Sequence, residues 1–218
     1  METRSLPARV HGRYLVEAAG RPPGAPLLVG FHGYGEAAEL HLQALRGLPG
    51  AESAVLVAVQ SLHLFYTRAR EVVGSWMTRV LREETIADNV AYAASVVAAV
   101  RSEFAPGGPL VYLGFSQGTS MAYRAAALAG HEARGVIALC GDLPPELAED
   151  RGLRLPPVLM ARGARDDWFT AEKMERDLAA LRARGVPARG LTFEGGHEWS
   201  PEFYAAAGEF LCEAIRDP

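Results

Sequence analysis

A serine lies between two glycines in the run Gly114-Phe115-Ser116-Gln117-Gly118, directly after an apolar stretch that is typical of a buried strand. Alanine-rich sequence with helical character follows over residues 120–129. In this strand–turn–helix context, Gly-x-Ser-x-Gly forms a nucleophile elbow, a sharp turn that holds the serine hydroxyl exposed. The glycines leave room where a Cβ would meet the crowded backbone of the turn. A Gly/Ser turn of this length also arises by chance, but its context predicts that Ser116 is a nucleophile.

A serine hydroxyl needs a base that removes its proton during attack. His197 follows the last predicted strand, and imidazoles titrate near neutral pH, so His197 is the candidate base. Asp166 follows the preceding strand and is the candidate acid that fixes the imidazole tautomer. The chain order Ser, Asp, His matches a known triad arrangement, and the carboxyl ends of parallel strands meet at one edge of a sheet. Asp166 could instead cap the next helix, which leaves Asp167 or Asp142 as alternative acids.

Two backbone N–H groups are candidates for binding the oxyanion of a tetrahedral intermediate. One belongs to Gln117, next after the serine, and the other to Tyr34 in a glycine-rich loop after an early strand. His32 begins that loop, and we interpret it as a structural histidine that shapes the site, because His197 already supplies the base. The candidate substrate-pocket residues lie in this loop or in the irregular stretch 61–81: His32, Gly33, Phe65 and Trp76.

No cofactor is expected from the motifs. Gly33-x-Gly35 follows a strand and precedes a helix, as a dinucleotide loop does, but the third glycine and a Gly-Lys-Ser/Thr run are missing. The remaining histidines lack mutual metal-ligand spacing, so we expect no metal site and interpret all four as surface or packing residues: His11, His41, His63 and His131.

The elements that must position these residues alternate along the chain. Continuous apolar runs predict strands buried on both faces at residues 26–31, 54–60, 111–115, 135–140, 157–163 and 188–194, and residues 10–18 suggest an edge strand. Helical patterns cover residues 37–46, 82–104, 120–129, 170–184 and 201–216. This alternation predicts an α/β fold, a mainly parallel central sheet with helices on both faces, in one domain spanning residues 1–218. The irregular stretch 61–81 is expected to face the substrate.

Composition narrows the class of protein. A net charge of −4 and a pI near 5.9 argue against nucleic-acid binding, which needs a basic face. The two cysteines, Cys140 and Cys212, have no CxxC spacing, which favours a reduced cytoplasmic protein. Residues 1–10 lack an apolar targeting segment, and no run approaches the length of a spanning helix, so no integral membrane segment is expected.

Taken together, the motifs resemble the carboxylesterase/phospholipase family of α/β-hydrolases, which includes acyl-protein thioesterases. The run 114–118 resembles the family's serine box, including its Phe and Gln, and the run 31–36 resembles its His-Gly-x-Gly-Asp oxyanion loop. Residues 163–166 match its Gly-x-x-Asp acid motif, which supports Asp166 over Asp167, and residues 196–197 match its Gly-His ending. Ser75-Trp76 falls where the family tends to place a Ser-Trp pair near the acyl site.

The resemblance implies the α/β-hydrolase fold without an inserted lid domain. It also implies cofactor-free hydrolysis of small-molecule esters or thioesters through an acyl-enzyme on Ser116, and it leaves a homodimer open. The chain departs from the family's pattern at several positions: Glu36 for Asp, Thr119 for Gly, Arg162 for His, and Gly141-Asp142 for a small uncharged turn. Arg162, Arg165 and Asp142 predict a more polar pocket, so a long-acyl specificity does not transfer. The alternatives are a non-catalytic ligand-binding protein on the same scaffold and a different serine hydrolase, such as a peptidase.

Overall fold

A seven-stranded sheet forms the centre of the protein, with the strand order β1-β3-β2-β6-β7-β8-β9. The computed structural model describes residues 2, 4–150, 152 and 154–216. β1 pairs antiparallel with β3 at one edge, and the other strands pair in parallel, which confirms the predicted edge strand and the mainly parallel sheet. The strands are β1 Tyr14–Glu17, β2 Leu27–Phe31, β3 Val55–Val59, β6 Leu110–Phe115, β7 Gly135–Leu139, β8 Val158–Gly163 and β9 Ala188–Phe193.

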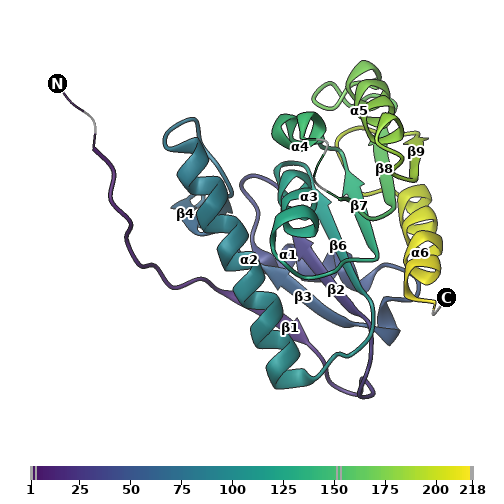
Figure 1. Cartoon of the computed structure of the whole chain (residues 1–218), viewed down its shortest axis with the longest axis horizontal. Coiled ribbons are helices and arrows are strands. Elements are labelled where there is room, and N and C mark those ends of the chain that lie inside the picture. The colour runs from purple at the N-terminus through teal and green to yellow at the C-terminus, as the bar shows by residue number, and fades with distance from the viewer. Residues whose placement is uncertain (1, 3, 151, 153, 217–218) are drawn as a thin grey trace.

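Helices cover both faces of this sheet (Figure 1). They are α1 Ala38–Arg46, α2 Arg82–Phe104, α3 Gln117–Leu128, α4 Pro145–Glu149, α5 Ala171–Ala183 and α6 Pro201–Ile215, with a short 3₁₀ helix at Ala51–Ser53. The residues of α1 and α6 pack on one face, and those of α2, α3, α4 and α5 pack on the other. The sequence predicted all of these helices except α4 and the 3₁₀ turn, which are too short to show a period.

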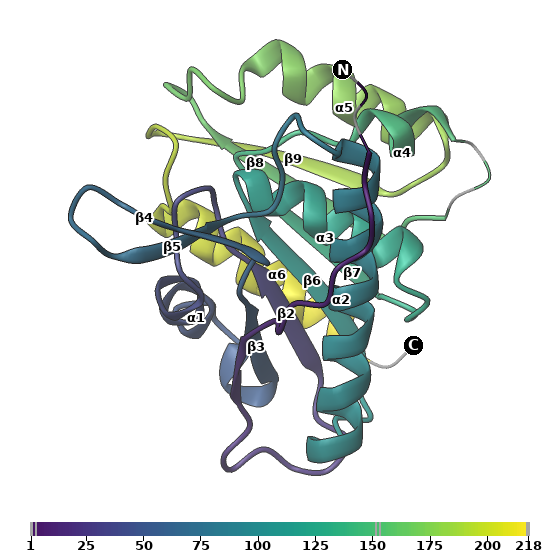
Figure 2. The same cartoon turned by 90° about the vertical axis from the view of Figure 1, so that its left-hand side faces the viewer.

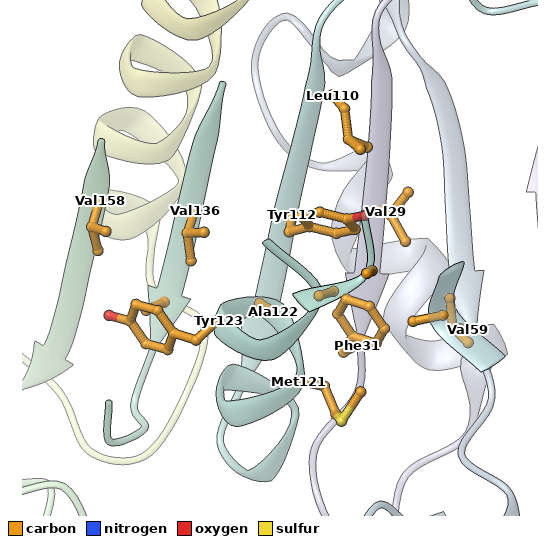
Figure 3. Close-up of a cluster of buried hydrophobic side chains, with 14 of the residues drawn as sticks. Val29, Phe31, Val59, Leu110, Tyr112, Met121, Ala122, Tyr123, Val136 and Val158 are labelled. Atoms are coloured by element: carbon orange, nitrogen blue, oxygen red, sulfur yellow. The ribbon is translucent and has the colours of Figure 1, made fainter. Parts of the chain in front are cut away.

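Alternate residues of each central strand enter opposite core clusters. In β2, Val29 and Phe31 face the cluster beneath α2 and α3, whereas Leu28 faces the cluster beneath α1 and α6. Figure 3 shows the first cluster, in which Phe31 and Tyr112 lie close to the side chains of α3. Burial on both faces explains why these strands are unbroken apolar runs in the sequence.

The stretch 61–81 is more ordered than the sequence predicted. It contains an antiparallel hairpin of β4 His63–Tyr66 and β5 Val72–Ser75, which projects from the body of the molecule (Figure 2). Its turn is closed by a hydrogen bond from the Thr67 N–H to the Glu71 carbonyl, 2.9 Å long. Apolar residues on both faces of these strands hide the alternation by which a half-buried strand is recognised.

Two further sequence predictions can be compared with the structure. Cys140 and Cys212 are both free thiols. Within the described parts of the chain, every helix is too short or too polar to cross a bilayer.

Candidate active site

Ser116 lies on the sharp turn between β6 and α3. Its φ of 53° and ψ of −119° place a non-glycine residue in a strained conformation, of the kind that persists where the surroundings fix it. A Cβ on Gly118 would lie 2.0 Å from the Phe31 carbonyl oxygen, and one on Gly114 would lie 2.4 Å from the Gly118 oxygen. The Ser116 N–H donates to the Leu139 carbonyl at 2.8 Å. The two glycines of the motif are therefore required by close backbone approach.

Asp166 and His197 meet beyond the carboxyl ends of β8 and β9. The distance from His197 Nδ1 to Asp166 Oδ2 is 2.9 Å, and the carboxylate is buried while the imidazole is partly exposed. With its Nδ1 proton donated to Asp166, the imidazole presents an unprotonated Nε2. The ring also lies 5.2 Å, centroid to centroid, from Phe115, the residue before the serine.

The loop around Asp166 holds the carboxylate ionised. Burial acts to raise the pKa of Asp166, but the N–H groups of Phe169 and Trp168, His197 and the Cys140 thiol together hold it below its usual value. Those two N–H groups donate to Oδ1 at 2.9 and 2.8 Å. Asp166 thus binds the turn that follows it and contacts His197, but it does not cap the next helix, because Thr170 caps α5.

The two alternative acids lie elsewhere. Asp167 is exposed and has no hydrogen-bond partner among the described residues. Asp142 pairs with Lys173 at 3.6 Å and Arg176 at 3.5 Å. The geometry therefore favours Asp166 as the residue that orients His197.

Arg162 and Arg165 do not make the pocket polar in the way the sequence suggested. Arg162 is buried and donates to the carbonyls of Phe169, at 2.8 Å, and Asp166, at 3.3 Å, so it braces the loop that carries the acid. Arg165 is exposed and pairs with Glu194 at 3.1 Å.

Cys140 lies beside Asp166 and His197, and the sequence analysis did not identify it as a residue of the site. It is fully buried at the end of β7 with a φ of 55°, and its sulfur, the Asp166 carboxylate and a His197 ring nitrogen lie within 4.8 Å of one another. Burial, followed by the Asp166 charge, raises the pKa of the Cys140 thiol to about 12, so it is a neutral hydrogen-bond donor. These three residue types could in principle ligate a metal ion, but the Asp166 oxygens already accept bonds from protein donors. The sequence signal that could have identified Cys140 is its position directly after β7, at the sheet edge where the other candidate residues lie.

The loop 32–36, which we predicted to form part of an oxyanion hole and call the oxyanion loop, is held by the β4–β5 hairpin. The Gly35 N–H donates to the Gly74 carbonyl, and the Gly74 N–H donates to the Glu36 carbonyl, both at 2.9 Å. Within the loop, the Gly33 N–H donates to the Glu36 carboxylate at 2.7 Å. Burial raises the pKa of Glu36, while the Gly33 N–H and His197 act to lower it.

These bonds leave two N–H groups available at the site. Within the described chain, neither the Tyr34 N–H nor the Gln117 N–H has a hydrogen-bond partner. Gln117 is the first residue of α3, where an N–H has no intrahelical partner and the helix dipole favours negative charge. The predicted oxyanion hole is thus compatible with the backbone geometry.

His32 supports the oxyanion loop from beneath and is not open to a substrate. Its Nδ1 lies 2.7 Å from the Gly33 carbonyl, while Nε2 lies 3.0 Å from Gln60 Nε2 and 3.1 Å from the Ser61 N–H. This arrangement requires a proton on Nδ1 and a lone pair on Nε2. Burial lowers the pKa of His32 to about 4, so the ring is neutral at pH 7. The structure supports the interpretation of His32 as a structural histidine.

The Gln117 side chain fastens the segment after β5 to the start of α3. Its Oε1 accepts from the Trp76 N–H at 2.8 Å and the Ser75 hydroxyl at 3.3 Å, and its Nε2 donates to the Met77 carbonyl at 3.1 Å. Trp76 is almost fully buried and donates from Nε1 to the His32 carbonyl at 2.8 Å. The Ser-Trp pair therefore shapes the site through the Ser75 hydroxyl, the Trp76 backbone N–H and the buried indole ring of Trp76.

A cleft of about 760 Å³ lies next to Gln117, the residue after the candidate nucleophile Ser116, between the segment after β5, α3, α4 and α5. We call it the α3–α5 cleft. It includes Trp76, whereas the candidate Phe65 lies 5.5 Å from Tyr34, ring centroid to ring centroid, outside this cleft. The polar and charged residues of its lining are Thr78, Arg79, Arg82, Gln117, Ser120, Arg124, Asp142, Glu149, Lys173, Arg176 and Asp177.

No protein-family model and no curated protein matches the sequence. Solved structures do resemble the fold. A carboxylesterase from Bacillus cereus superposes with a TM-score of 0.75 at 16% identity over 94% of this chain and 95% of that one. Esterase PE8 superposes with a TM-score of 0.73 at 23% identity, over 95% of this chain and 100% of that chain. Acyl-protein thioesterase 2 from Zea mays superposes with a TM-score of 0.72 at 19% identity, over 94% of this chain and 100% of that chain. The protein therefore has the α/β-hydrolase fold of such esterases and thioesterases.

Proposed function

We propose that this protein is a serine hydrolase that cleaves carboxylic esters or thioesters through an acyl-enzyme on Ser116. The fold alone does not fix an activity, since many functions share it. The observation that carries the proposal is the 2.9 Å contact between His197 Nδ1 and the buried Asp166 carboxylate, at the same sheet edge as the strained Ser116. A protein that only binds a ligand has no need of a buried carboxylate that fixes an imidazole tautomer.

The proposed reaction follows from these groups. His197 Nε2 takes the Ser116 hydroxyl proton as Oγ attacks the carbonyl carbon, and Asp166 stabilises the imidazolium. The N–H groups of Tyr34 and Gln117 bind the negative oxygen of the tetrahedral intermediate. On collapse, His197 returns the proton to the leaving alcohol or thiol, and the acyl group stays on Ser116. Water, activated by His197 in the same way, then releases the acid.

Labelling and turnover together test the proposal. We expect a fluorophosphonate probe to modify Ser116, and p-nitrophenyl esters and acyl thioesters to be hydrolysed with a kcat/KM that Ser116→Ala abolishes. Ser95→Ala provides a matched control, because Ser95 lies exposed on α2 with its hydroxyl bonded to the Ala91 carbonyl. Failure of both labelling and hydrolysis would favour the binding-protein alternative.

A further inference from the structure

Charged side chains make up eight of the 17 residues that line the α3–α5 cleft. Five of its lining residues are cationic and three are acidic; the cationic ones are Arg79, Arg82, Arg124, Lys173 and Arg176. At the α5 end, Lys173 and Arg176 are balanced by Asp142 and Asp177. At the other end, Arg82 and Arg124 share Glu146, Arg82 also pairs with Glu83 at 3.1 Å, and Glu149 lines the cleft, so most of the positive charge there is balanced as well.

Arg124 is the most deeply buried cation of the cleft. It lines the cleft from α3, yet only 2% of its surface is exposed. Its Nε and Nη2 contact Glu146 Oε1 at 2.8 and 2.7 Å, while Nη1 has no hydrogen-bond partner in the described structure. The same carboxylate also accepts from Arg82 at 3.1 Å. Glu146 thus contacts two guanidinium groups, and Arg82 has a second partner in Glu83, at 3.1 Å.

An unpaired guanidinium N–H in a buried position is costly, and an ordinary apolar acyl chain would not satisfy it. A planar guanidinium is well suited to a carboxylate. Arg79 adds a second cation at the cleft, with no ion pair among the residues described. The chemistry of the cleft therefore favours an anion.

The position of the cleft decides which part of a substrate it would hold. Gln117, next after the nucleophile, lines the cleft, and so does Asp142, which follows Gly141; a Cβ on Gly141 would lie 2.4 Å from the Ser116 carbonyl oxygen. His197 is not among the residues of the cleft. Because His197 protonates the leaving group in the proposed mechanism, the leaving group lies on its side and the acyl group lies in the cleft.

We infer that the α3–α5 cleft binds an acyl group that ends in a carboxylate, with Arg124 as the residue that recognises this anion. The substrates would be monoesters or monothioesters of dicarboxylic acids, a class that rests on the proposed function of Ser116. Arg124 follows Gln117 by seven residues, about 10 Å along the axis of α3, and helical side chains lean toward the N-terminus. The carboxylate thus binds within about 10 Å of the nucleophile, which suits an acyl chain of medium length.

The test compares two esters of equal length, mono-p-nitrophenyl adipate and its methyl ester, in which the distal carboxylate is capped. We expect wild-type kcat/KM to favour the free carboxylate by about tenfold or more, as a charge-assisted hydrogen bond gives. Arg124→Met should bring this ratio close to one, mainly through KM, and Arg124→Lys should restore part of it. Glu146 keeps Arg82 as a partner in both variants. Arg189→Met, which breaks the distant pair with Glu213, should leave the ratio unchanged.

Three outcomes overturn the inference: a wild-type ratio near one, a ratio that Arg124→Met does not change, or an equal effect of Arg189→Met. If Arg124→Met does not fold, calorimetry of Ser116→Ala with free adipate gives an independent measurement, and absence of binding overturns the inference. Hydrolysis of p-nitrophenyl hexanoate separates the two proposals. If Ser116-dependent hydrolysis of this ester persists while the carboxylate preference is absent, only the anion site is wrong.

Discussion

At the scale of single residues, the candidate site depends on hydrogen bonds that fix protonation states. Asp166 is held ionised by two backbone N–H groups, so its second oxygen is available to one imidazole tautomer of His197. His32 lies in the same region but with its two ring nitrogens occupied by the backbone and Gln60. The two histidines therefore differ in availability: one presents a free nitrogen at the surface, and the other is a buried brace.

Asp166→Asn tests the tautomer argument. The amide oxygen can still accept from Trp168 and Phe169, but the NH₂ group would face His197 Nδ1 and favour the opposite tautomer. We expect kcat for p-nitrophenyl esters to fall by roughly 10³- to 10⁴-fold, with little change in melting temperature. Asp167→Asn, one residue along and exposed, should keep full activity. A loss below tenfold in Asp166→Asn would mean that another carboxylate is the acid.

Gly118 tests the packing of the elbow. A Cβ there would lie 2.0 Å from the Phe31 carbonyl oxygen, which belongs to the backbone and cannot move away cheaply. Gly118→Ala should lower the free energy of unfolding by about 2 kcal/mol or more, with a large loss of kcat. In Gly130→Ala the Cβ meets no atom within 4 Å, so only the positive φ should cost about 1 kcal/mol. Equal urea midpoints for the two variants would contradict the steric argument.

At the scale of elements, contacts between the β4–β5 hairpin, the oxyanion loop and the start of α3 organise the site. Gly74 pairs with the oxyanion loop on one side, and the Gln117 side chain holds residues 75–77 on the other. The hairpin is therefore part of the framework that orients the Tyr34 N–H, and its order should affect catalysis without its contacting the reacting atoms.

Gln117→Leu tests this coupling, because it removes three hydrogen bonds of the side chain and retains the backbone N–H. We expect faster amide exchange in β4 and β5 and a loss of about 1–3 kcal/mol in the free energy of unfolding, since buried donors lose their acceptor. kcat should fall as the oxyanion loop loosens. Gln43→Leu is the control, because Gln43 lies exposed on α1 and its replacement should leave amide exchange in the hairpin unchanged. Unchanged exchange in the hairpin would show that the side chain does not hold it.

The sequence predicted the main-sheet strands, the long helices and the strand-end residues Ser116, Asp166 and His197, because each signal is local. An apolar run predicts a strand, and the candidate reactive residues directly follow the strands in the sequence. The hairpin, the partners of Gln117 and the unpaired Nη1 of Arg124 could not be predicted in this way. They depend on contacts between distant segments, such as the bond between Trp76 and Gln117, 41 residues apart. Asp166 was chosen over Asp142 from its place at a strand end, and the ion pairs of Asp142 with Lys173 and Arg176 are additional evidence that only the structure supplies.

At the scale of the whole molecule, two buried histidines beneath the sheet edge make stability depend on pH. Burial lowers the pKa of His32 to about 4 and that of His41 to about 3, from 6.5. The unfolded chain binds more protons than the folded one between those values and 6.5. The stability that depends on these two histidines being neutral is therefore fully present above pH 6.5 and is lost as the pH drops toward 4. Asp166 contributes little to this change. Because its pKa is lowered, the stability that its ionised carboxylate provides is lost only in more acidic solution.

His41→Leu separates the two histidines. Each should contribute a slope of about 1.4 kcal/mol per pH unit below pH 6.5, so removing one should roughly halve the fall in unfolding free energy between pH 7 and pH 5. Among the described residues, neither ring nitrogen of His41 has a hydrogen-bond partner, so leucine should also stabilise the protein at pH 7. Urea unfolding at both pH values measures this, with exposed His11→Leu as the control. If the fall in unfolding free energy were as steep in His41→Leu as in the wild type, burial would not lower the pKa of His41 in the folded protein, and the argument would be wrong.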